Sequence, residues 1–105
     1  MYFEDFYMYP DSVLNPKLLW EFDLHNFNFI ANRNLTVQRV IERGWPTDWY
    51  FMLNLYGVDG VKSAIKEITY LNEKDLNFVS HQFAIPQTSM KCCEKKQLAK
   101  QHWGS

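Results

Sequence analysis

The sequence predicts an all-α protein, a small helical bundle of four main helices with short extra turns and an extended basic C-terminal tail. Apolar residues recur three and four positions apart in four stretches between residues 34 and 85, as they do on the buried face of a helix. Asn, Gly or Pro bounds each stretch. The turns between the stretches have two to five residues, which favours antiparallel packing of neighbouring helices.

Residues 1–13 form a leader that is aromatic and acidic and shows neither helical nor strand periodicity. We expect this leader to be poorly ordered or to lie along a surface. Asn15 followed by Pro16 is typical of a helix start, because the Asn side chain caps the turn and proline suits the first helical position; it predicts a short turn over residues 17–20. Residues 23–29 predict a short helix or an irregular packed segment, and the core candidates around it are Phe22, Leu24, Phe27 and Phe29.

The first two main helices are predicted between Asn34 and Gly57. The first has an apolar face of Val37, Val40 and Ile41, and we expect Gly44 to end it in a left-handed conformation. Thr47, which follows a proline, is the predicted cap of the second helix. The buried face of that second helix consists of Trp49, Met52, Leu53 and Tyr56, and Gly57 is its predicted end.

The third and fourth main helices follow Gly57. The third has Val61, Ala64, Ile65 and Ile68 at helical spacing. Asn72 with Asp75 three residues later predicts a cap for the fourth helix, which then buries Leu76, Val79 and Phe83. Ile85 and Pro86 end it, because proline cannot continue a helix.

Length and charge define one domain with a distinct tail. A chain of 105 residues is short for two cores, so we expect a single helical domain over residues 14–90. Residues 1–90 carry seven Lys and Arg against eleven Asp and Glu, whereas residues 91–105 carry four Lys against one Glu. The acidic body lacks the positive field that drives nonspecific binding to phosphates. Aromatics make up 17% of the chain, and we expect some of these rings to face a partner.

The cysteines and the N-terminus predict a cytoplasmic protein. Cys92 and Cys93 are adjacent, and adjacent cysteines rarely form a disulfide because the ring strains the peptide between them. Two reduced thiols are typical of the cytosol. The first residues are acidic where a secretory signal is basic, and no apolar run approaches the length of a membrane span.

The sequence predicts a non-enzymatic protein without a metal ion or a cofactor. His81, the two cysteines and His102 lack the paired spacing of a structural zinc site. The carboxylates that lie near a second acid–base group, Asp23 with His25 and Asp48 with Glu42, show no more than ordinary spacing, and acids in such places more often face solvent or cap a helix.

Residues 71–90 resemble a helix-turn-helix element only loosely. A capped Leu71 to Leu76 segment precedes an Ile-Pro turn, as in such DNA readers, but nine residues separate Leu76 from Ile85. The motif usually allows about six residues there. We therefore favour a bundle helix that ends at a proline.

The C-terminal tail, residues 91–105, is the predicted partner-binding site. It combines positive charge, hydrogen-bonding groups and one terminal aromatic residue that can fill a pocket or stack. The predicted contacts are Lys91, Lys95, Lys96, Gln97, Lys100, His102 and Trp103. The competing interpretation is a solvated chain end.

Several short stretches, in order, carry a resemblance that covers residues 14–103. They are Leu19-Trp20 with Asp23, Val40 to Gly44, Asp48-Trp49 with Leu53 and Leu55-Tyr56-Gly57, Ile68 with Leu71, Leu76 to Ser80, Ile85-Pro86, and Lys95-Lys96-Gln97 to His102-Trp103. Together they resemble a family of short bacterial proteins of unknown function that are commonly encoded directly beside AbiEii-type nucleotidyltransferase toxins.

This resemblance implies an interaction protein, the antitoxin-like or accessory partner of a nucleotidyltransferase toxin. It implies no catalytic residues. The alternative is a small nucleic-acid-binding regulator in which the lysines of the C-terminal tail contact phosphate.

Overall fold

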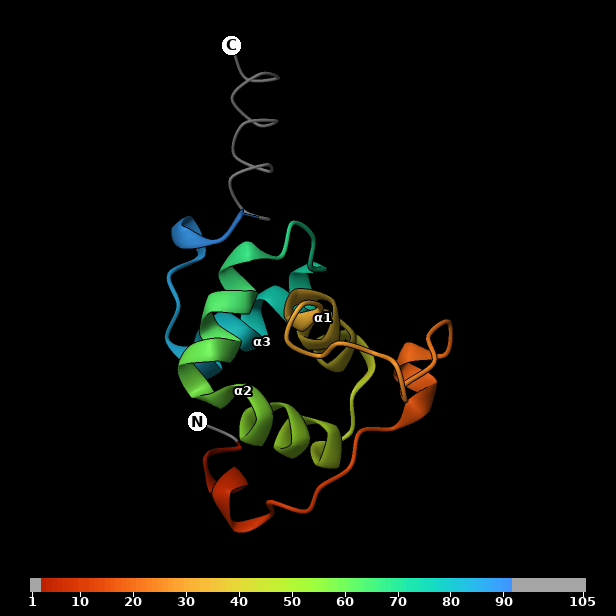
Figure 1. Ribbon diagram of the computed structural model, residues 1–105. Coiled ribbons are helices and arrows are strands. Elements are labelled where there is room, and N and C mark those ends of the chain that lie inside the picture. Colours follow the sequence, from red (N-terminus) through yellow and green to blue (C-terminus); the bar gives the residue numbers. More distant parts are fainter. Residues whose placement is uncertain (1–2, 92–105) are drawn as a thin grey trace.

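The computed structural model describes residues 3–91 as three helices connected by loops and short turns (Figure 1). The helices are α1 (Arg33–Arg43), α2 (Pro46–Glu67) and α3 (Glu73–Phe83). Three 3-10 turns complete the described chain, η1 (Glu4–Met8), η2 (Pro16–Leu19) and η3 (Gln87–Ser89), and residues 3–91 contain no strand. The predicted all-α class is confirmed. Within this described part, no helix has the length and apolar character that crossing a bilayer requires.

The prediction of four main helices is wrong, because the second and third predicted helices form the single bent element α2. Gly57 lies inside α2 with φ 75° and ψ 166°, which is not helical, and the helix resumes directly after it without a loop. A Cβ atom at Gly57 would meet nothing within 4 Å. Glycine is therefore required here by the backbone conformation and not by crowding. The two halves of α2 therefore run in different directions, as Figure 1 shows.

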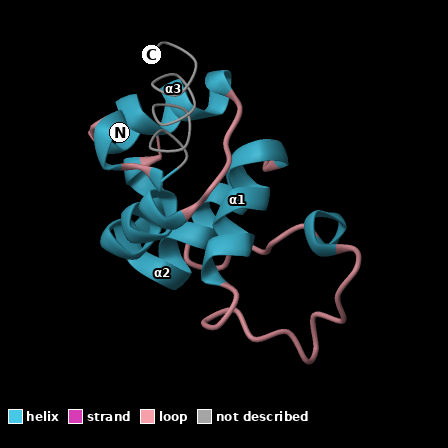
Figure 2. Cartoon of the chain, turned by 90° about the horizontal axis from the view of Figure 1, so that it is seen from above, coloured by secondary structure: helices cyan, strands magenta, loops and turns pink. Residues whose placement is uncertain are grey.

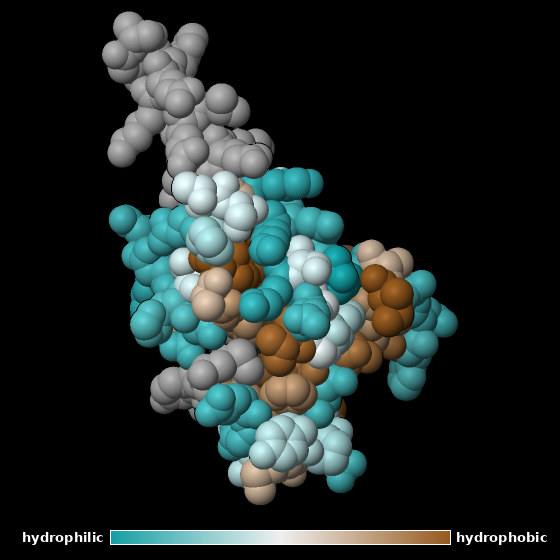
Figure 3. Space-filling model, turned by 90° about the vertical axis from the view of Figure 1, so that its left-hand side faces the viewer, coloured by the Kyte–Doolittle hydropathy of each residue, from teal (hydrophilic) through white to brown (hydrophobic). Residues whose placement is uncertain are grey.

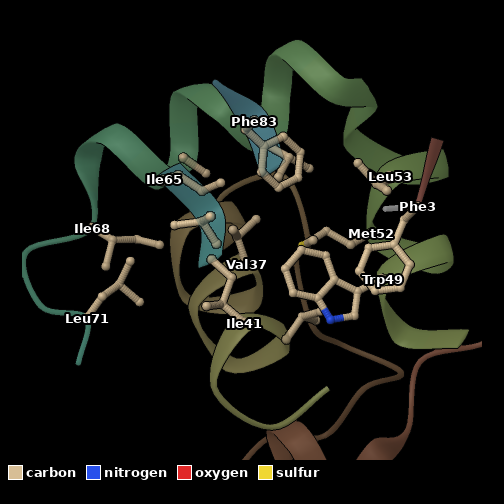
Figure 4. Close-up of a cluster of buried hydrophobic side chains, with 14 of the residues drawn as sticks. Phe3, Val37, Ile41, Trp49, Met52, Leu53, Ile65, Ile68, Leu71 and Phe83 are labelled. Atoms are coloured by element: carbon tan, nitrogen blue, oxygen red, sulfur yellow. The ribbon is translucent and has the colours of Figure 1, made fainter. Parts of the chain in front are cut away.

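One hydrophobic core lies between the three helices (Figure 4). The predicted apolar faces supply most of it: Val37, Val40, Ile41, Trp49, Met52, Leu53, Val61, Ala64, Ile65, Ile68, Leu76, Val79 and Phe83 are buried. Leu24, Phe27 and Phe29 are partly buried against this core. Phe22 is 39% exposed, so its assignment to the core is wrong.

Two helix ends differ from their predictions. Gly44 is extended at φ −73° and ψ 148° rather than left-handed, and glycine is needed because a Cβ there would lie 2.5 Å from the carbonyl oxygen of Val40. The N-cap residue of α2 is Trp45, so the prediction of Thr47 is wrong. The helix start is closed instead by Asp48, whose carboxylate accepts from the backbone N–H of Trp45.

Two other predicted caps are confirmed. The side-chain oxygen of Asn72 accepts from the backbone N–H of Asp75 at 2.8 Å. The side-chain oxygen of Asn15 accepts from the backbone N–H of Lys17 at 3.0 Å, and Pro16 begins η2 as predicted. These caps are local, since donor and acceptor lie within three residues of each other.

Candidate partner-binding surface

The chain before α1 forms an N-terminal arm, residues 3–32, that passes along the outside of the helices. Figure 1 shows it as the red to orange segment at the lower and right-hand edges of the molecule. Figure 2 shows loop segments on either side of a short helical turn standing away from the helices. The arm contains only the short turns η1 and η2. Its position depends on its own buried side chains Phe3, Leu14, Leu18 and Leu19 and on side chains that the helices direct toward it.

Asn54 of α2 fixes the first part of the N-terminal arm. Its side-chain nitrogen donates to the carbonyl oxygens of Phe6 at 2.9 Å and Tyr9 at 3.1 Å. Aromatic rings add to this attachment. The ring of Phe3 stacks on that of Trp49 with centroids 4.8 Å apart, and the ring of Tyr9 stacks on that of Tyr50 at the same distance. Such pairs contribute about 0.5–1.5 kcal/mol each beyond the area they bury.

Asp48 joins the N-terminal arm to the start of α2. One carboxylate oxygen accepts from the backbone N–H of Asn15 and the other from that of Trp45, both at 2.8 Å. The residue is 1% exposed. A carboxylate also suits this place because the first turn of a helix carries partial positive charge. Asp48 therefore positions the backbone of two segments that lie 30 residues apart in the sequence.

Arg39 of α1 fixes the arm at η2. Its guanidinium donates to the carbonyl oxygen of Leu18 at 3.0 Å and pairs with the carboxylate of Glu21 at 2.8 Å. The hydrogen bond from Arg39 lowers the pKa of the Glu21 carboxyl below its ordinary value.

Tyr56 of α2 fixes the last part of the arm. Its hydroxyl donates to the carbonyl oxygen of Phe29 at 2.6 Å. Burial raises the pKa of this hydroxyl above its ordinary value, because the phenolate would lose its hydration there. The N-terminal arm is thus attached to the helices at four places along its length.

The attached arm presents large apolar side chains to solvent. We call six of them the arm strip, and they are Tyr7, Met8, Tyr9, Val13, Trp20 and Phe22. They are six of the eleven large apolar side chains exposed in residues 3–91, and they lie within 16 residues of sequence. The most exposed are Trp20 at 76% and Val13 at 75%. Figure 3 views the molecule from the left-hand side of Figure 1, and on that face brown apolar side chains reach the surface between teal hydrophilic ones.

An open depression of about 430 Å³ lies at one end of the arm strip. Its lining combines the turn η2 with the loop that follows, and comprises Pro16, Lys17, Trp20, Phe22, Asp23, Leu24 and His25. The lining is more apolar than polar, and two aromatic side chains border it. Such a shallow apolar depression can receive a side chain of another protein.

Of the predicted partner-binding residues, only Lys91 lies within the described part of the chain. Lys91 is exposed and directly follows Met90, whose side chain is fully buried. Lys95, Lys96, Gln97, Lys100, His102 and Trp103 lie outside the described residues, as do Cys92 and Cys93. The arm strip was missed because its residues follow no helical or strand period. The one available signal was the density of aromatic residues at the N-terminus.

The residues considered for catalysis or metal binding have structural partners or lie apart. The Asp23 carboxylate accepts from the backbone N–H of His25 at 3.1 Å and from the Asn26 side chain at 3.0 Å, which makes it part of a turn. Asp48 binds backbone groups, and Glu42 is exposed. His81 is exposed in the last turn of α3. No three metal-binding side chains gather anywhere in residues 3–91.

The segment after α3 contains no second helix of recognition type before residue 91. It consists of the turn η3 (Gln87–Ser89), and the hydroxyl of Ser80 donates to the carbonyl oxygen of Ile85 at 2.7 Å. Ala84 ends α3 in the left-handed conformation at φ 51°. This arrangement ends α3 and keeps the following segment on the core, where Ile85 and Met90 are buried.

Residues 14–65 match a protein family described as a family of unknown function (DUF6922). The matched segment includes η2, α1 and most of α2, and it begins where the N-terminal arm reaches its Asp48 anchor. No curated protein and no solved structure matches the chain. Similarity to a family of unknown function is therefore confirmed over these residues, and the toxin partner stays a prediction.

Proposed function

We propose that the protein is a non-enzymatic interaction protein, the antitoxin-like or accessory partner of a nucleotidyltransferase toxin. The observation that carries this proposal is the arm strip, which holds exposed aromatic and aliphatic side chains on a segment attached to the core. Exposed apolar clusters in small proteins are typical of interaction surfaces. In this role the protein acts in the cytoplasm of a bacterial cell.

The attachment of the N-terminal arm to the helices favours the interpretation that the arm binds a partner over the interpretation that it is a frayed chain end. A partner gains affinity from side chains that are already held in place, because less conformational entropy is lost on binding. Asn54, Asp48, Arg39 and Tyr56 hold the backbone on both sides of the exposed rings. The hydrogen bonds are made to backbone groups, so they leave the two most exposed side chains of the strip, Val13 and Trp20, available for a partner.

The C-terminal tail supplies the second half of the proposal. A nucleotidyltransferase must hold metal-binding carboxylates and a channel for nucleotide phosphates. A tail with four lysines and a terminal aromatic residue has the charge and the hydrogen-bonding groups to occupy such a channel and to exclude substrate. Lys91 begins this tail at the point where the buried Met90 ends the core.

Truncation after Met90 tests the proposed role of the tail. A chain of residues 1–90 retains every side chain of the described core, so we expect it to fold. We expect the truncated chain to lose neutralisation when it is co-expressed with the nucleotidyltransferase predicted beside its gene, while the full chain restores growth. Circular dichroism of the purified truncated chain serves as the control for folding. Growth protected equally by both chains would show that the tail has no such role.

The alternative, a nucleic-acid-binding regulator, makes a different prediction about salt. Phosphate contacts release counterions, so the logarithm of the affinity falls linearly with the logarithm of salt concentration. A packed protein interface weakens less over the same range. Residues 1–90 carry a net formal charge of −4, from seven basic and eleven acidic residues, which disfavours the regulator unless the tail alone makes the contacts.

A further inference from the structure

Asp48 brings two exposed apolar side chains to one edge of the molecule, because it joins the backbone segments that carry them. Its carboxylate accepts from the backbone N–H groups of Asn15 and Trp45, each at 2.8 Å. Val13 precedes Asn15 by two residues and is 75% exposed, and the side chain of Trp45 is 71% exposed. Among the described residues, no aromatic ring packs against that of Trp45. Both side chains are therefore free to contact a partner.

Two exposed cations flank this apolar pair. Lys17 follows Asn15 by two residues. Arg43 precedes Trp45 by two residues. Within residues 3–91, neither cation forms an ion pair with a carboxylate. We call these four side chains the junction surface, and they are Val13, Lys17, Arg43 and Trp45.

The carboxylates of the neighbouring segments are bound to other groups or lie on another face. Those oxygens of Asp48 accept from backbone N–H groups, and the carboxylate of Glu21 pairs with Arg39. Arg43 follows Arg39 by four residues, so it shares the face of α1 that contacts the N-terminal arm. Glu42 precedes Arg43 directly and therefore lies about 100° away around the helix.

On the arm, Asp11 is the one acidic residue within four positions of Asn15. It lies beyond Val13 along the chain, whereas Lys17 lies on the other side of Asn15. The positive charge of Lys17 and Arg43 is thus left without a local carboxylate partner.

A ligand that fits the junction surface must bury an apolar side chain and supply negative charge beside it. Tryptophan and arginine are enriched among the residues that contribute most to protein–protein binding. Carboxylates placed opposite the two cations fix the orientation of the bound segment. A single nucleic acid strand also combines anions with apolar faces. The net charge of −4 on residues 1–90 disfavours that ligand and favours a short protein segment.

We propose that the junction surface binds an acidic segment of a partner protein, in which an aliphatic or aromatic side chain lies next to carboxylates. The apolar side chain packs between Val13 and Trp45, and the carboxylates pair with Lys17 and Arg43. This inference goes beyond the proposed function, because it applies to any partner that carries such a segment.

Selection from a library of random dodecapeptides displayed on phage tests this proposal, with the full chain as bait. We expect the enriched peptides to carry Asp or Glu next to an aliphatic or aromatic residue. One enriched peptide is then synthesised with a fluorescent label, and its affinity for the full chain is measured by fluorescence anisotropy.

Substitution of the exposed tryptophan locates the bound peptide. We expect Trp45→Ser to weaken binding by at least about tenfold, because the aromatic contact is lost while the backbone N–H that Asp48 binds is retained. Tyr70→Ser, at another exposed aromatic residue, is the matched control and should leave the affinity within about twofold of that of the unchanged chain.

Neutralising the two cations tests the charge of the surface. We expect Lys17→Gln/Arg43→Gln to weaken binding by about three- to tenfold at low salt and by less at high salt. The control Lys66→Gln/Lys74→Gln removes the same charge from exposed positions elsewhere and should bind as the unchanged chain does. Circular dichroism of each variant confirms that folded proteins are compared.

Three results would overturn the proposal. They are the absence of enriched peptides, enriched peptides without acidic residues, and binding that Trp45→Ser leaves unchanged. Tighter binding of single-stranded oligothymidylate, weakened by the same substitutions, would instead assign the surface to nucleic acid. The selection involves no nucleotidyltransferase, so its failure leaves the proposed function intact, and failure to recover a nucleotidyltransferase from the host leaves the junction surface intact.

Discussion

Asp48 attaches the N-terminal arm to the start of α2 through its buried carboxylate. Its two oxygens satisfy two backbone N–H groups from separate segments, and Asp48 itself is almost fully buried. An unsatisfied buried donor costs about 1–3 kcal/mol. We expect Asp48→Ala to lower the free energy of unfolding by about 2–4 kcal/mol in chemical denaturation.

Asp59→Ala is the matched control for Asp48→Ala, because Asp59 is an exposed aspartate of the same helix. We expect it to change stability by less than about 0.5 kcal/mol. Equal effects of the two substitutions would show that the two backbone contacts of Asp48 do not stabilise the protein.

Tyr56 makes the stability of the protein dependent on pH in alkaline solution. Burial raises its pKa above the ordinary value of 10.0. The unfolded chain therefore ionises first as pH rises, and the contribution of Tyr56 is fully present below that value and is lost as pH rises through the pKa of the folded state.

Tyr56→Phe should remove this part of the alkaline loss of stability. It should also lower the free energy of unfolding at neutral pH by about 1 kcal/mol, because the hydrogen bond to Phe29 is lost. Tyr70→Phe, at an exposed position, is the control. Unfolding measured by denaturant between pH 8 and pH 11 distinguishes the variants, and identical pH profiles for Tyr56→Phe and the unchanged chain would contradict the assignment.

At the scale of elements, Gly57 determines the shape of α2. The backbone at residue 57 has φ 75° and ψ 166°, a region that is almost restricted to glycine. A residue with a side chain adopts this conformation only at a cost of about 1–3 kcal/mol. We expect Gly57→Ala to lower the free energy of unfolding by this amount, although its Cβ would contact nothing.

Ser63→Ala, at an exposed position of the same helix, provides the comparison for Gly57→Ala. We expect it to be neutral or slightly stabilising, because alanine has the higher helix propensity. A stabilising effect of Gly57→Ala would show that α2 is straight at residue 57 in solution.

The sequence predicts the helices well where local patterns determine them. The apolar face of Val37, Val40 and Ile41 follows from its spacing, and the caps at Asn15 and Asn72 follow from contacts within three residues. The prediction fails where the cause lies elsewhere in the chain or in the backbone. Gly57 bends a helix instead of ending it, and Asp48 caps its own helix while binding Asn15, which is 33 residues away.

The candidate surface is harder to predict from the sequence than the helices are. Exposure of Trp20 and Phe22, and burial of Phe3 and Leu14, depend on how the N-terminal arm passes over α1 and α2, and no periodicity encodes this path. The division of charge between the acidic body and the basic tail, by contrast, can be counted directly from the sequence. Apart from Lys91, the tail lies outside the described residues, so its role stays a prediction.

At the scale of the whole molecule, one core carries the N-terminal arm, and the sequence that follows the core is basic. The three helices bury the apolar faces that the sequence predicts, and the N-terminal arm brings rings and carboxylates to the outside. The chain then continues from the buried Met90 into a basic tail. In the proposed role, the partner presents apolar pockets to the arm strip and acidic groups to the lysines of the tail.

Affinity capture with the full chain tests the proposed partnership most directly. The bait is incubated with a nuclease-treated lysate of the native host, and the retained proteins are identified by mass spectrometry. The account predicts recovery of a nucleotidyltransferase. Recovery of no protein partner, together with retention of nucleic acid when the nuclease is omitted, would contradict it and favour the nucleic-acid-binding regulator.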